Sequence, residues 1–208
     1  MCTLRRMDMI STLAMASGMA WSSGLRLYML VFMAGMFQRF HVMDLPVGLA
    51  VLSHTWVLGT AGTLMVVEFV ADKIPAVDSV WDAVHTFIRI PAGAALAAAA
   101  LGTFHEPAFT VVAALLGGTL AATSHFTKAT SRAVINTSPE PVSNIAASIA
   151  EETVVGGATL LMHAHPLIFL CALGAVVVSS LCVLYVMVRY LRRVIQAIVN
   201  QCTTAIST

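Results

Sequence analysis

The sequence predicts an all-α protein that crosses a membrane several times, because of its composition and the length of its apolar runs. Of the 208 residues, 59% are hydrophobic and 10% are charged, whereas a soluble domain has about 25% charged residues. The mean hydropathy is +0.88. Several runs reach the roughly 20 residues that a helix needs to cross a bilayer core. We therefore expect a polytopic helical membrane protein in a lipid bilayer, with residues 1–208 as a single transmembrane domain.

The first three expected helices follow from apolar runs and the prolines between them. Proline lacks an amide donor and suits the first turn of a helix. Residues 9–37 form the first helix, which "HVMDLP" ends. Residues 47–71 form the second, which starts after Pro46 and stops before "DKIP". Residues 77–103 form the third, which begins after Pro75 with a charged half and continues into "GAALAAAALG".

The last three expected helices each follow a proline-containing break. They cover residues 107–131 after "FHEP", residues 141–163 after "NTSPEP" and residues 166–194 after "HAHP". About six transmembrane helices result. Residues 195–208 continue as a basic amphipathic tail, which we expect on the inner leaflet in the cytoplasm.

Basic residues predict the orientation, because cytoplasmic loops carry an excess of Lys and Arg. Six spans put both ends on one side, and that side holds Arg5, Arg6, Lys73, Lys128, Arg132, Arg189, Arg192 and Arg193. The loops of the other side hold little beyond Arg39. We expect a multi-pass protein of the bacterial cytoplasmic (inner) membrane with both termini in the cytoplasm.

A weak internal repeat links the second and third helices to the fourth and fifth. A shift of 64 residues places Pro75 on Pro139 and Gly93 on Gly157. The two units have the same orientation if the third helix crosses completely. They are inverted, as in many transporters, if it is re-entrant.

Residues 68–89, "EFVADKIPAVDSVWDAVHTFIR", concentrate charge in this apolar chain. Side chains four residues apart lie on one helix face. This spacing predicts polar stripes on four helices, made of Glu68 and Asp72; of Asp78, Asp82, His85 and Arg89; of Lys128, Arg132 and Asn136; and of Asn144, Ser148 and Glu151 or Glu152.

The stripes must face one another or water, because one ionised group at mid-bilayer costs about 2.5 to 3.5 kcal/mol. In one interpretation, ion pairs such as Glu68 with Arg132 and Asp82 with Lys128 lock the helices together. In the other, the stripes line a polar cavity open to the cytoplasm, where carboxylates titrate or hold a cation. The acids outnumber the bases in these stripes, and that surplus favours the cavity.

Other residues are candidates for the site or for the wall of its cavity. Arg26 lies deep in the first helix and needs a partner, for which Glu151 is our expectation. Trp81 precedes an acidic residue and is expected to wall the cavity. Pro91 and Gly93 predict a kink beside the charged stripe, although close packing of small residues also explains Gly93. As gating or wall positions we expect Pro75, Trp81, Pro91, Gly93, Pro139 and Pro141.

Two long segments, "EFVADKIPAVDSVWDAVHTFIRIPAGA" and "TKATSRAVINTSPEPVSNIAASIAEE", resemble DUF4126, a bacterial integral membrane family of unknown function. The resemblance runs from "SGLRLY" through Glu152, where the family is expected to have Asp, so the carboxylate is kept. It implies importance for Glu68, Asp72, Lys73, Pro75, Asp78, Trp81, Asp82, His85, Lys128, Arg132, Asn136, Pro139, Pro141, Asn144 and Glu151. It implies no activity, substrate or cofactor.

Three functions remain open at this stage. The first is a small transporter or channel for an ion or small polar solute, with the cavity built by the second to fifth helices. The second is a structural or assembly protein held by ion pairs. The third is an enzyme on a lipid-linked substrate, with Asp78, Asp82 and His85 as metal ligands or acid and base groups.

Several partners can be judged from composition. The net charge of +1 provides no polybasic field for nucleic acid, and the four cysteines form no zinc-type pair. The sequence assigns no cofactor or metal. Faces rich in Gly and Ala suit packing within the chain or between copies in a homo-oligomer.

Overall fold

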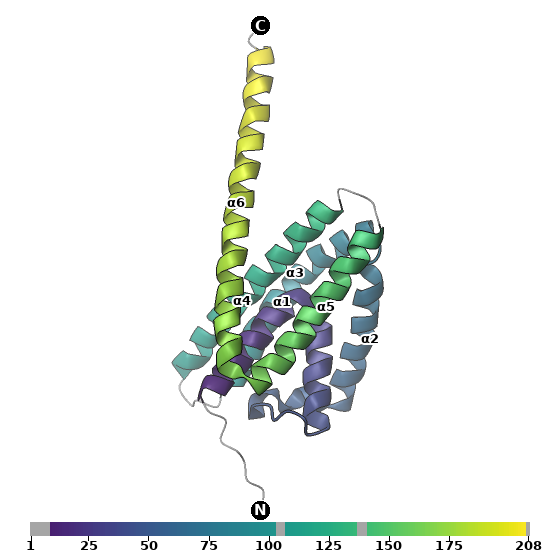
Figure 1. Ribbon diagram of the computed structural model, residues 1–208, viewed down its shortest axis with the longest axis vertical. Helices are drawn as coiled ribbons and strands as arrows, with labels where there is room; N and C mark the ends of the chain where they lie inside the picture. The colour runs from purple at the N-terminus through teal and green to yellow at the C-terminus, as the bar shows by residue number, and fades with distance from the viewer. Residues whose placement is uncertain (1–8, 103–106, 137–140, 207–208) are drawn as a thin grey trace, which may run out of the picture.

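The computed structural model describes residues 9–102, 107–136 and 141–206, and within these ranges it is helical without strands. The expected all-α fold is therefore confirmed. The elements are α1 (Met9–Arg39), the 3-10 helix η1 (Val47–Ser53), α2 (Thr55–Ala71), α3 (Pro75–Leu101), α4 (Pro107–Ile135), α5 (Pro141–Ala164) and α6 (Pro166–Ile206). They form one bundle, from which α6 projects at one end (Figure 1).

The first helix does not cross the bundle as expected, because α1 is interrupted at Arg26, whose φ of −144° and ψ of 76° are not helical. The two arms of α1 both run from inside the bundle toward the same end of it (Figure 1). In the first arm, Gly18 lies against Phe169 at the start of α6. In the second arm, Arg39 Nη1 donates to Thr55 Oγ1, at the start of α2, over 3.2 Å. Helix α1 is thus re-entrant, with Arg26 at its apex.

Among the described residues, four helices are long and apolar enough to cross a membrane, which confirms a polytopic membrane fold. These segments are Ala76–Leu101, Pro107–Ile135, Val142–Ala164 and Pro166–Tyr190. The pair formed by η1 and α2, bent by 67°, is a fifth if it counts as one span. The expected six spans are not confirmed, since α1 turns back at its apex.

The two described ends of the chain also differ from the expected arrangement. The start of α1 lies near one end of the bundle and the end of α6 lies beyond the other (Figure 1). Helix α6 runs on through the expected tail to Ile206, because the sequence has neither Gly nor Pro after Gly174 to stop it. The two ends therefore do not lie on one side.

The other expected boundaries hold to within a few residues. The second expected helix is divided at His54, where the backbone is extended with a ψ of 138°. Helix α4 ends at Ile135 rather than at residue 131. Helix α3 runs unbroken from Pro75 to Leu101 with Pro91 inside it. Because α3 is unbroken and long enough to cross a membrane, the arrangement fits the same-orientation form of the repeat, and the repeat itself stays a prediction.

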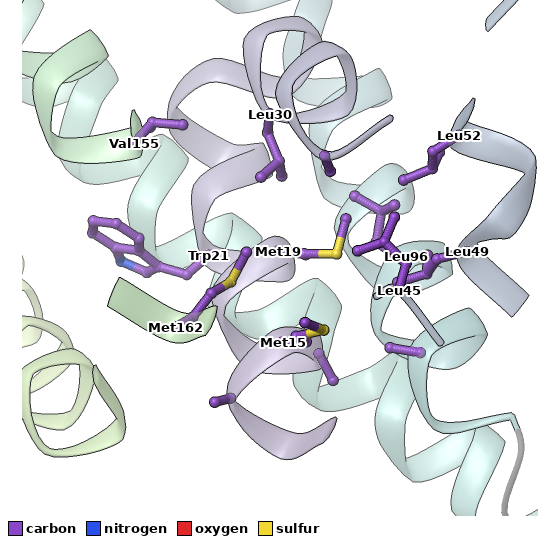
Figure 2. Close-up of a cluster of buried hydrophobic side chains, with 14 of the residues drawn as sticks. Met15, Met19, Trp21, Leu30, Leu45, Leu49, Leu52, Leu96, Val155 and Met162 are labelled. Carbon is purple, nitrogen blue, oxygen red and sulfur yellow. The ribbon is translucent and has the colours of Figure 1, made fainter. Parts of the chain in front are cut away.

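The apolar core surrounds the arms of α1. It contains Met15, Met19, Leu30, Leu49 and Met162 (Figure 2). Large apolar side chains elsewhere face outward, as expected for a surface in lipid, and they include Phe87, Val111 and Leu115.

Small residues let α1, α3 and α4 approach one another closely just before the apex. A Cβ on Gly24 would collide with Ser124 and with the Ala121 carbonyl of α4. A Cβ on Gly93 would collide with Ala121 of α4 and with Ser23 of α1. Gly93 therefore serves helix packing, and this close approach brings α4 against the apex of α1.

Candidate functional site

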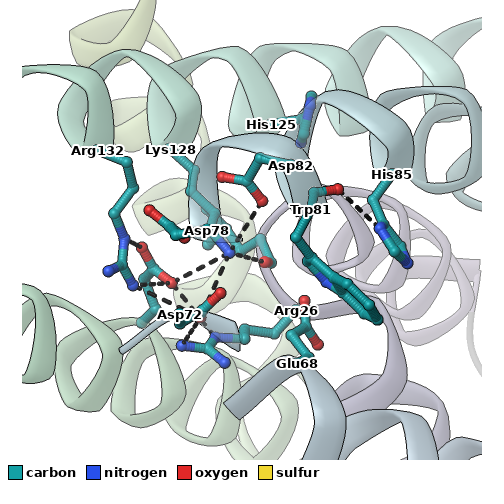
Figure 3. Close-up of polar contacts among 12 residues, drawn as sticks. Arg26, Glu68, Asp72, Asp78, Trp81, Asp82, His85, His125, Lys128 and Arg132 are labelled. Carbon is teal, nitrogen blue, oxygen red and sulfur yellow. Dashed lines mark hydrogen bonds and ion pairs between the residues drawn. The ribbon is translucent and has the colours of Figure 1, made fainter. Parts of the chain in front are cut away.

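The charged residues of five helices meet in one cluster, which we call the buried charge network (Figure 3). Its members are Arg26 of α1, Glu68 and Asp72 at the end of α2, Asp78, Asp82 and Arg89 of α3, Lys128 and Arg132 of α4, and Glu151 and Glu152 of α5. All of these except the two glutamates of α5 are at most 4% exposed. The stripes predicted from helical spacing therefore do converge.

Arg89 joins α2 and α3 by pairing with two carboxylates. Its Nη2 donates to Glu68, and its Nη1 donates to Asp82 Oδ1 at 2.6 Å. The expected pair of Glu68 with Arg132 is wrong, since Arg132 binds both oxygens of Glu151 at 2.9 and 3.0 Å. The guanidinium of Arg132 is thus already held by α5.

Near the apex of α1, the carboxylates of Asp72 and Glu151 each form ion pairs with several cations. Asp72 Oδ2 lies 2.5 Å from Arg26 Nη2, 3.6 Å from Arg132 Nη2 and 3.8 Å from Lys128 Nζ. Glu151 Oε2 lies 3.3 Å from Arg26 Nε and 3.4 Å from Lys128 Nζ. The expected pair of Arg26 with Glu151 is therefore present.

Lys128 connects the two groups of ion pairs. Its Nζ lies 3.5 Å from Asp82 Oδ1, as expected. It also donates to the backbone carbonyl of Leu25 at 3.3 Å. That carbonyl precedes the break at Arg26, so it lies at the carboxyl end of a half-helix, where backbone oxygens are open to outside donors.

Amides and a hydroxyl extend the network toward the turns between helices. Arg26 Nη2 donates to Ser148 Oγ at 2.6 Å. Arg132 Nη1 donates to Asn144 Oδ1 at 3.2 Å, and Asn144 Nδ2 donates to Asn136 Oδ1 at 2.9 Å. Asn136 Nδ2 in turn donates to Asp78 Oδ2 at 3.2 Å. The predicted Asn136 and Asn144 thus link Asp78 to the cations indirectly.

Two histidines flank the network. His85 Nδ1 donates to the Trp81 carbonyl at 2.8 Å, and in a neutral ring its Nε2 then accepts from the Tyr28 hydroxyl at 3.0 Å. The Trp81 ring stacks on His85 at 4.0 Å. His125 lies 2.7 Å from Thr86 Oγ1. These contacts place both rings beside the ion pairs and apart from the carboxylates.

Carboxylates exceed cations inside the network. Six of its members are acidic, namely Glu68, Asp72, Asp78, Asp82, Glu151 and Glu152, and four are basic, namely Arg26, Arg89, Lys128 and Arg132. Five buried carboxylate oxygens accept no hydrogen bond from the described residues: Glu68 Oε2, Asp72 Oδ1, Asp72 Oδ2, Asp78 Oδ1 and Asp82 Oδ2. Of these, Asp72 Oδ2 lies within ion-pair distance of cations. Burial of unpaired charge is costly, so protonation or a bound cation would stabilise these carboxylates.

Lys73 lies at the edge, in the turn between α2 and α3. Its Nζ lies 2.8 Å from the centroid of the Phe69 ring and donates to the Phe69 carbonyl at 3.0 Å. Partial burial removes water from the ammonium and lowers the pKa of Lys73 below its usual value. Lys73 was a predicted site residue, but it takes no part in the ion pairs that the structure describes.

The predicted wall and gating residues have different positions. Trp81 lies beside the network, whereas Pro91 is exposed. Pro75 and Pro141 begin α3 and α5. Pro139 lies outside the described residues.

The expected open cavity is replaced by side-chain contacts. The charged groups touch one another and are shielded from solvent, and Glu151 and Glu152 are the more exposed members, at 14% and 28%. An open groove of about 500 Å³ lies nearby between α1, α2 and α3, and its lining is mostly apolar. Tyr28 lines this groove and also contacts His85.

The enzyme interpretation gains nothing from this geometry. Asp78, Asp82 and His85 contact different partners, respectively Asn136, Arg89 and Tyr28. Among the described residues, no three His, Cys, Asp or Glu side chains are arranged to hold a metal ion.

Sequence reasoning missed several participants. Arg89 was placed in the stripe of α3 but was not selected, although it follows Asp82 by seven residues on the same face. His125 was not part of the predicted stripes, although it precedes Lys128 by three residues on α4. Nothing in the sequence indicates that the Leu25 carbonyl takes part, because backbone groups leave no such signal.

Comparison with known proteins supplies a family without a function. A family model described as "Domain of unknown function (DUF4126)" matches residues 13–188, which include every member of the network. No curated protein and no solved structure matches the chain.

Proposed function

The chain belongs to the DUF4126 family, and we propose that it is a small transporter or channel for an ion or small polar solute, with the buried charge network as its binding site. The surplus of carboxylates favours a small cation or a proton as the substrate or coupling ion. The bacterial inner membrane is the location that we propose.

The observation that carries this proposal is the excess of six carboxylates over four cations, with five buried carboxylate oxygens that accept no hydrogen bond from the described residues. Ion pairs that only hold helices together give no reason for a surplus of one charge. Intramembrane ionisable groups typically mark ion pathways and proton relays. The surplus therefore supports a site that takes up and releases positive charge.

The re-entrant α1 adds to this support. Secondary transporters commonly bind their substrates where half-helices end inside the membrane, and half-helix carboxyl ends coordinate cations there. The break at Arg26 puts such an end beside Lys128 and three carboxylates. A break in a helix is also a place where two arms can move separately, which an opening of this closed site requires.

The basic residues orient the site in our proposal. The turn between α2 and α3 and the far end of α6 lie toward the same end of the bundle (Figure 1), and Asp72 and Asp78 of the network flank that turn. Lys73, Arg189, Arg192 and Arg193 belong to these segments, so we place that side in the cytoplasm. The start of α1 is then on the opposite side, in place of the two cytoplasmic ends that six spans predict.

Flux through proteoliposomes tests the proposal. Gradients of sodium, potassium or methylammonium chloride are imposed in separate runs, and proton movement is followed with an internal pH-sensitive dye. We expect flux above that of empty vesicles for at least one salt. Asp82→Asn and Glu151→Gln each remove a network charge and should lower that flux by about tenfold or more.

Asp44→Asn is the matched control, because Asp44 is exposed and lies outside the network. Its flux should equal that of the wild type. Absence of wild-type flux with all three salts, or full flux in both network variants, would overturn the proposal.

A structural role is the second candidate, and ten ion pairs joining five helices favour it. In a purely structural protein, the same two network variants lower stability while no salt gives flux above that of empty vesicles. The two candidates therefore differ in the wild-type flux itself.

A further inference from the structure

An apolar groove lies outside the buried charge network, between the second arm of α1, α2 and α3. Its volume is about 500 Å³, and ligand pockets typically have roughly 300 to 1,000 Å³. Its walls include Val31 of α1, Thr60 and Ala61 of α2, and Ala92 and Ala95 of α3. None of the described residues that line it carries a charge. The groove therefore suits an apolar ligand.

The groove exists because α2 packs mainly against α1 and only sparsely against α3. One wall belongs to the segment Ala76–Leu101, which is apolar enough to cross a membrane, and Thr60 and Ala95 are exposed on its two sides. An empty groove loses the dispersion contacts of its walls, and an apolar cavity does not hold water. In a bilayer, the hydrocarbon chains of lipids are therefore the material that fills it.

The groove is elongated along α2, as a lipid chain requires. Trp56, Thr60 and Leu64 line it, and their spacing of four residues places them on one helix face. At 1.5 Å per residue, this face extends over about 12 Å. Trp56 lies at the start of α2, whereas Tyr28 lines the groove two residues after the apex at Arg26. The groove thus runs from one end of the bundle inward to the edge of the network.

An exposed arginine lies at the outer end of the groove. Arg39 ends α1, and its Nη1 donates to Thr55 Oγ1 at 3.2 Å. Thr55 precedes Trp56, which lines the groove and is 80% exposed. Tryptophan rings are favoured at the membrane interface, where lipid headgroups lie. A guanidinium has five N–H donors and binds phosphate oxygens in pairs, so Arg39 complements the charge of a phosphate at this position.

We propose that the groove binds one acyl chain of a phospholipid whose phosphate pairs with Arg39. The lipid enters sideways from the leaflet at the end of the bundle toward which both arms of α1 run. Its chain packs against Tyr28, whose hydroxyl lies 3.0 Å from His85 Nε2 beside the network. The bound chain therefore fills the space between α2 and α3 and supports the helices that carry Glu68 and Arg89. This inference is independent of the proposed transport, which concerns the network.

Lipid binding to the purified protein tests the site. The protein is delipidated in dodecyl maltoside and titrated with dioleoylphosphatidylglycerol, and native mass spectrometry counts the lipids on each chain. We expect one tightly bound lipid on the wild type. Ala95→Phe places a ring in the groove and should weaken this binding at least about tenfold. Ala175→Phe is the matched control, because Ala175 is also exposed but belongs to α6 and does not line the groove. Its affinity should equal that of the wild type.

Arg39→Leu tests the contact with the phosphate. Dioleoylglycerol, which has the same chains without a phosphate, is the comparison lipid. Arg39→Leu should bind the phospholipid about threefold more weakly than the wild type does, and it should bind dioleoylglycerol as well as the wild type does. Equal losses for the two lipids would contradict the assignment of the phosphate to Arg39.

A second variant keeps the site testable if Ala95→Phe does not fold. Thr60→Phe fills the same groove from α2 and should give a similar loss of affinity. Absence of a bound lipid on the wild type, or wild-type affinity in a folded groove variant, overturns the proposal. A wild-type dimer that binds no lipid and that a groove variant dissociates would also overturn it, since a second copy would then cover the groove. None of these outcomes depends on flux, so the transport proposal stands or falls separately.

Discussion

The apex of α1 contacts neighbouring helices through ion pairs, whereas the two arms of α1 contact them through apolar packing. At the apex, Arg26 is joined to α2 and α5 through ion pairs with named partners. Along the arms, Met15, Met19 and Leu30 belong to the apolar core. A residue of the apolar core that is removed leaves a cavity, whereas a removed member of the buried charge network leaves an opposite charge without a partner. The two regions should therefore respond differently to the same kind of substitution.

The close packing of the arms explains why the network forms at the apex. Gly24 allows α1 to touch Ser124 and Ala121 of α4, and the Ser124 hydroxyl donates to the Trp21 carbonyl at 2.6 Å. Lys128 comes one turn after Ser124, so this contact brings its ammonium to the Leu25 carbonyl. Helix packing thus positions the charged side chains. Their ion pairs then stabilise the non-helical backbone at Arg26.

The largest effect is expected from Arg89→Leu. The leucine leaves Glu68, which is fully buried, and Asp82 without their closest cation. Loss of one partner of a buried pair costs about 3 to 5 kcal/mol, and two abandoned carboxylates place this variant near 5 kcal/mol. Denaturation of the purified protein in detergent measures the change in the free energy of unfolding.

Arg39→Leu is the control for Arg89→Leu, since Arg39 is an exposed arginine of the same bundle. It should change the free energy of unfolding by no more than about 0.5 kcal/mol. The double variant Glu68→Gln with Arg89→Gln should recover part of the lost stability, because neither charge is left alone. Equal effects of Arg39→Leu and Arg89→Leu would remove the contrast between the two regions.

A smaller effect is expected from Met15→Ala in the apolar core. Met15 is 2% exposed, and its truncation should lower the free energy of unfolding by about 3 kcal/mol. Met15→Leu conserves volume and should cost less than about 1.5 kcal/mol. Parallel denaturation curves of the two variants test this.

The matched conservative change in the network is Arg89→Lys, which keeps the charge. A lysine has one nitrogen where Arg89 uses two separate nitrogens for Glu68 and Asp82. We expect Arg89→Lys to cost more than Met15→Leu. The opposite order would mean that charge alone, without geometry, holds the network together.

The helices and the polar stripes could be predicted because they depend on local patterns. Apolar runs and prolines marked the helices, and spacing of four residues placed Asp82 and Lys128 on facing stripes, where they do pair. The re-entrant form of α1 was not predicted, because an apolar run of this length reads as a full span. The letters "SSGLR" at the break offer a signal only in retrospect, since small residues there permit close packing as well as a turn.

The sequence also did not predict which charged residues of the network pair with each other. Glu68 pairs with Arg89 on the adjacent helix in the chain, whereas spacing suggested Arg132. Spacing gives the face on which a side chain lies, but the partner depends on the tilt and depth of each helix. Those are properties of tertiary packing, and a single sequence does not encode them in any one stretch.

The smallest expected effect on stability distinguishes Glu151 from Glu152, which helical spacing did not separate. Glu151 binds Arg132 at 2.9 Å and lies within 3.4 Å of Arg26 and Lys128. Among the described residues Glu152 forms an ion pair with Arg26 alone, at 3.6 Å, and its side chain is 28% exposed. Glu151→Gln should therefore lower the free energy of unfolding by about 2 kcal/mol, and Glu152→Gln by less than about 1 kcal/mol.

Paired denaturation of these two variants sharpens the comparison within the network itself. The same atom is changed in each, on adjacent residues of one helix, so differences in helix propensity do not enter. If Glu152→Gln proves as costly as Glu151→Gln, then short contacts with three cations add nothing over one distant contact. In that case the total charge of the network, and not the individual contact distances around Lys128, would determine its contribution to stability.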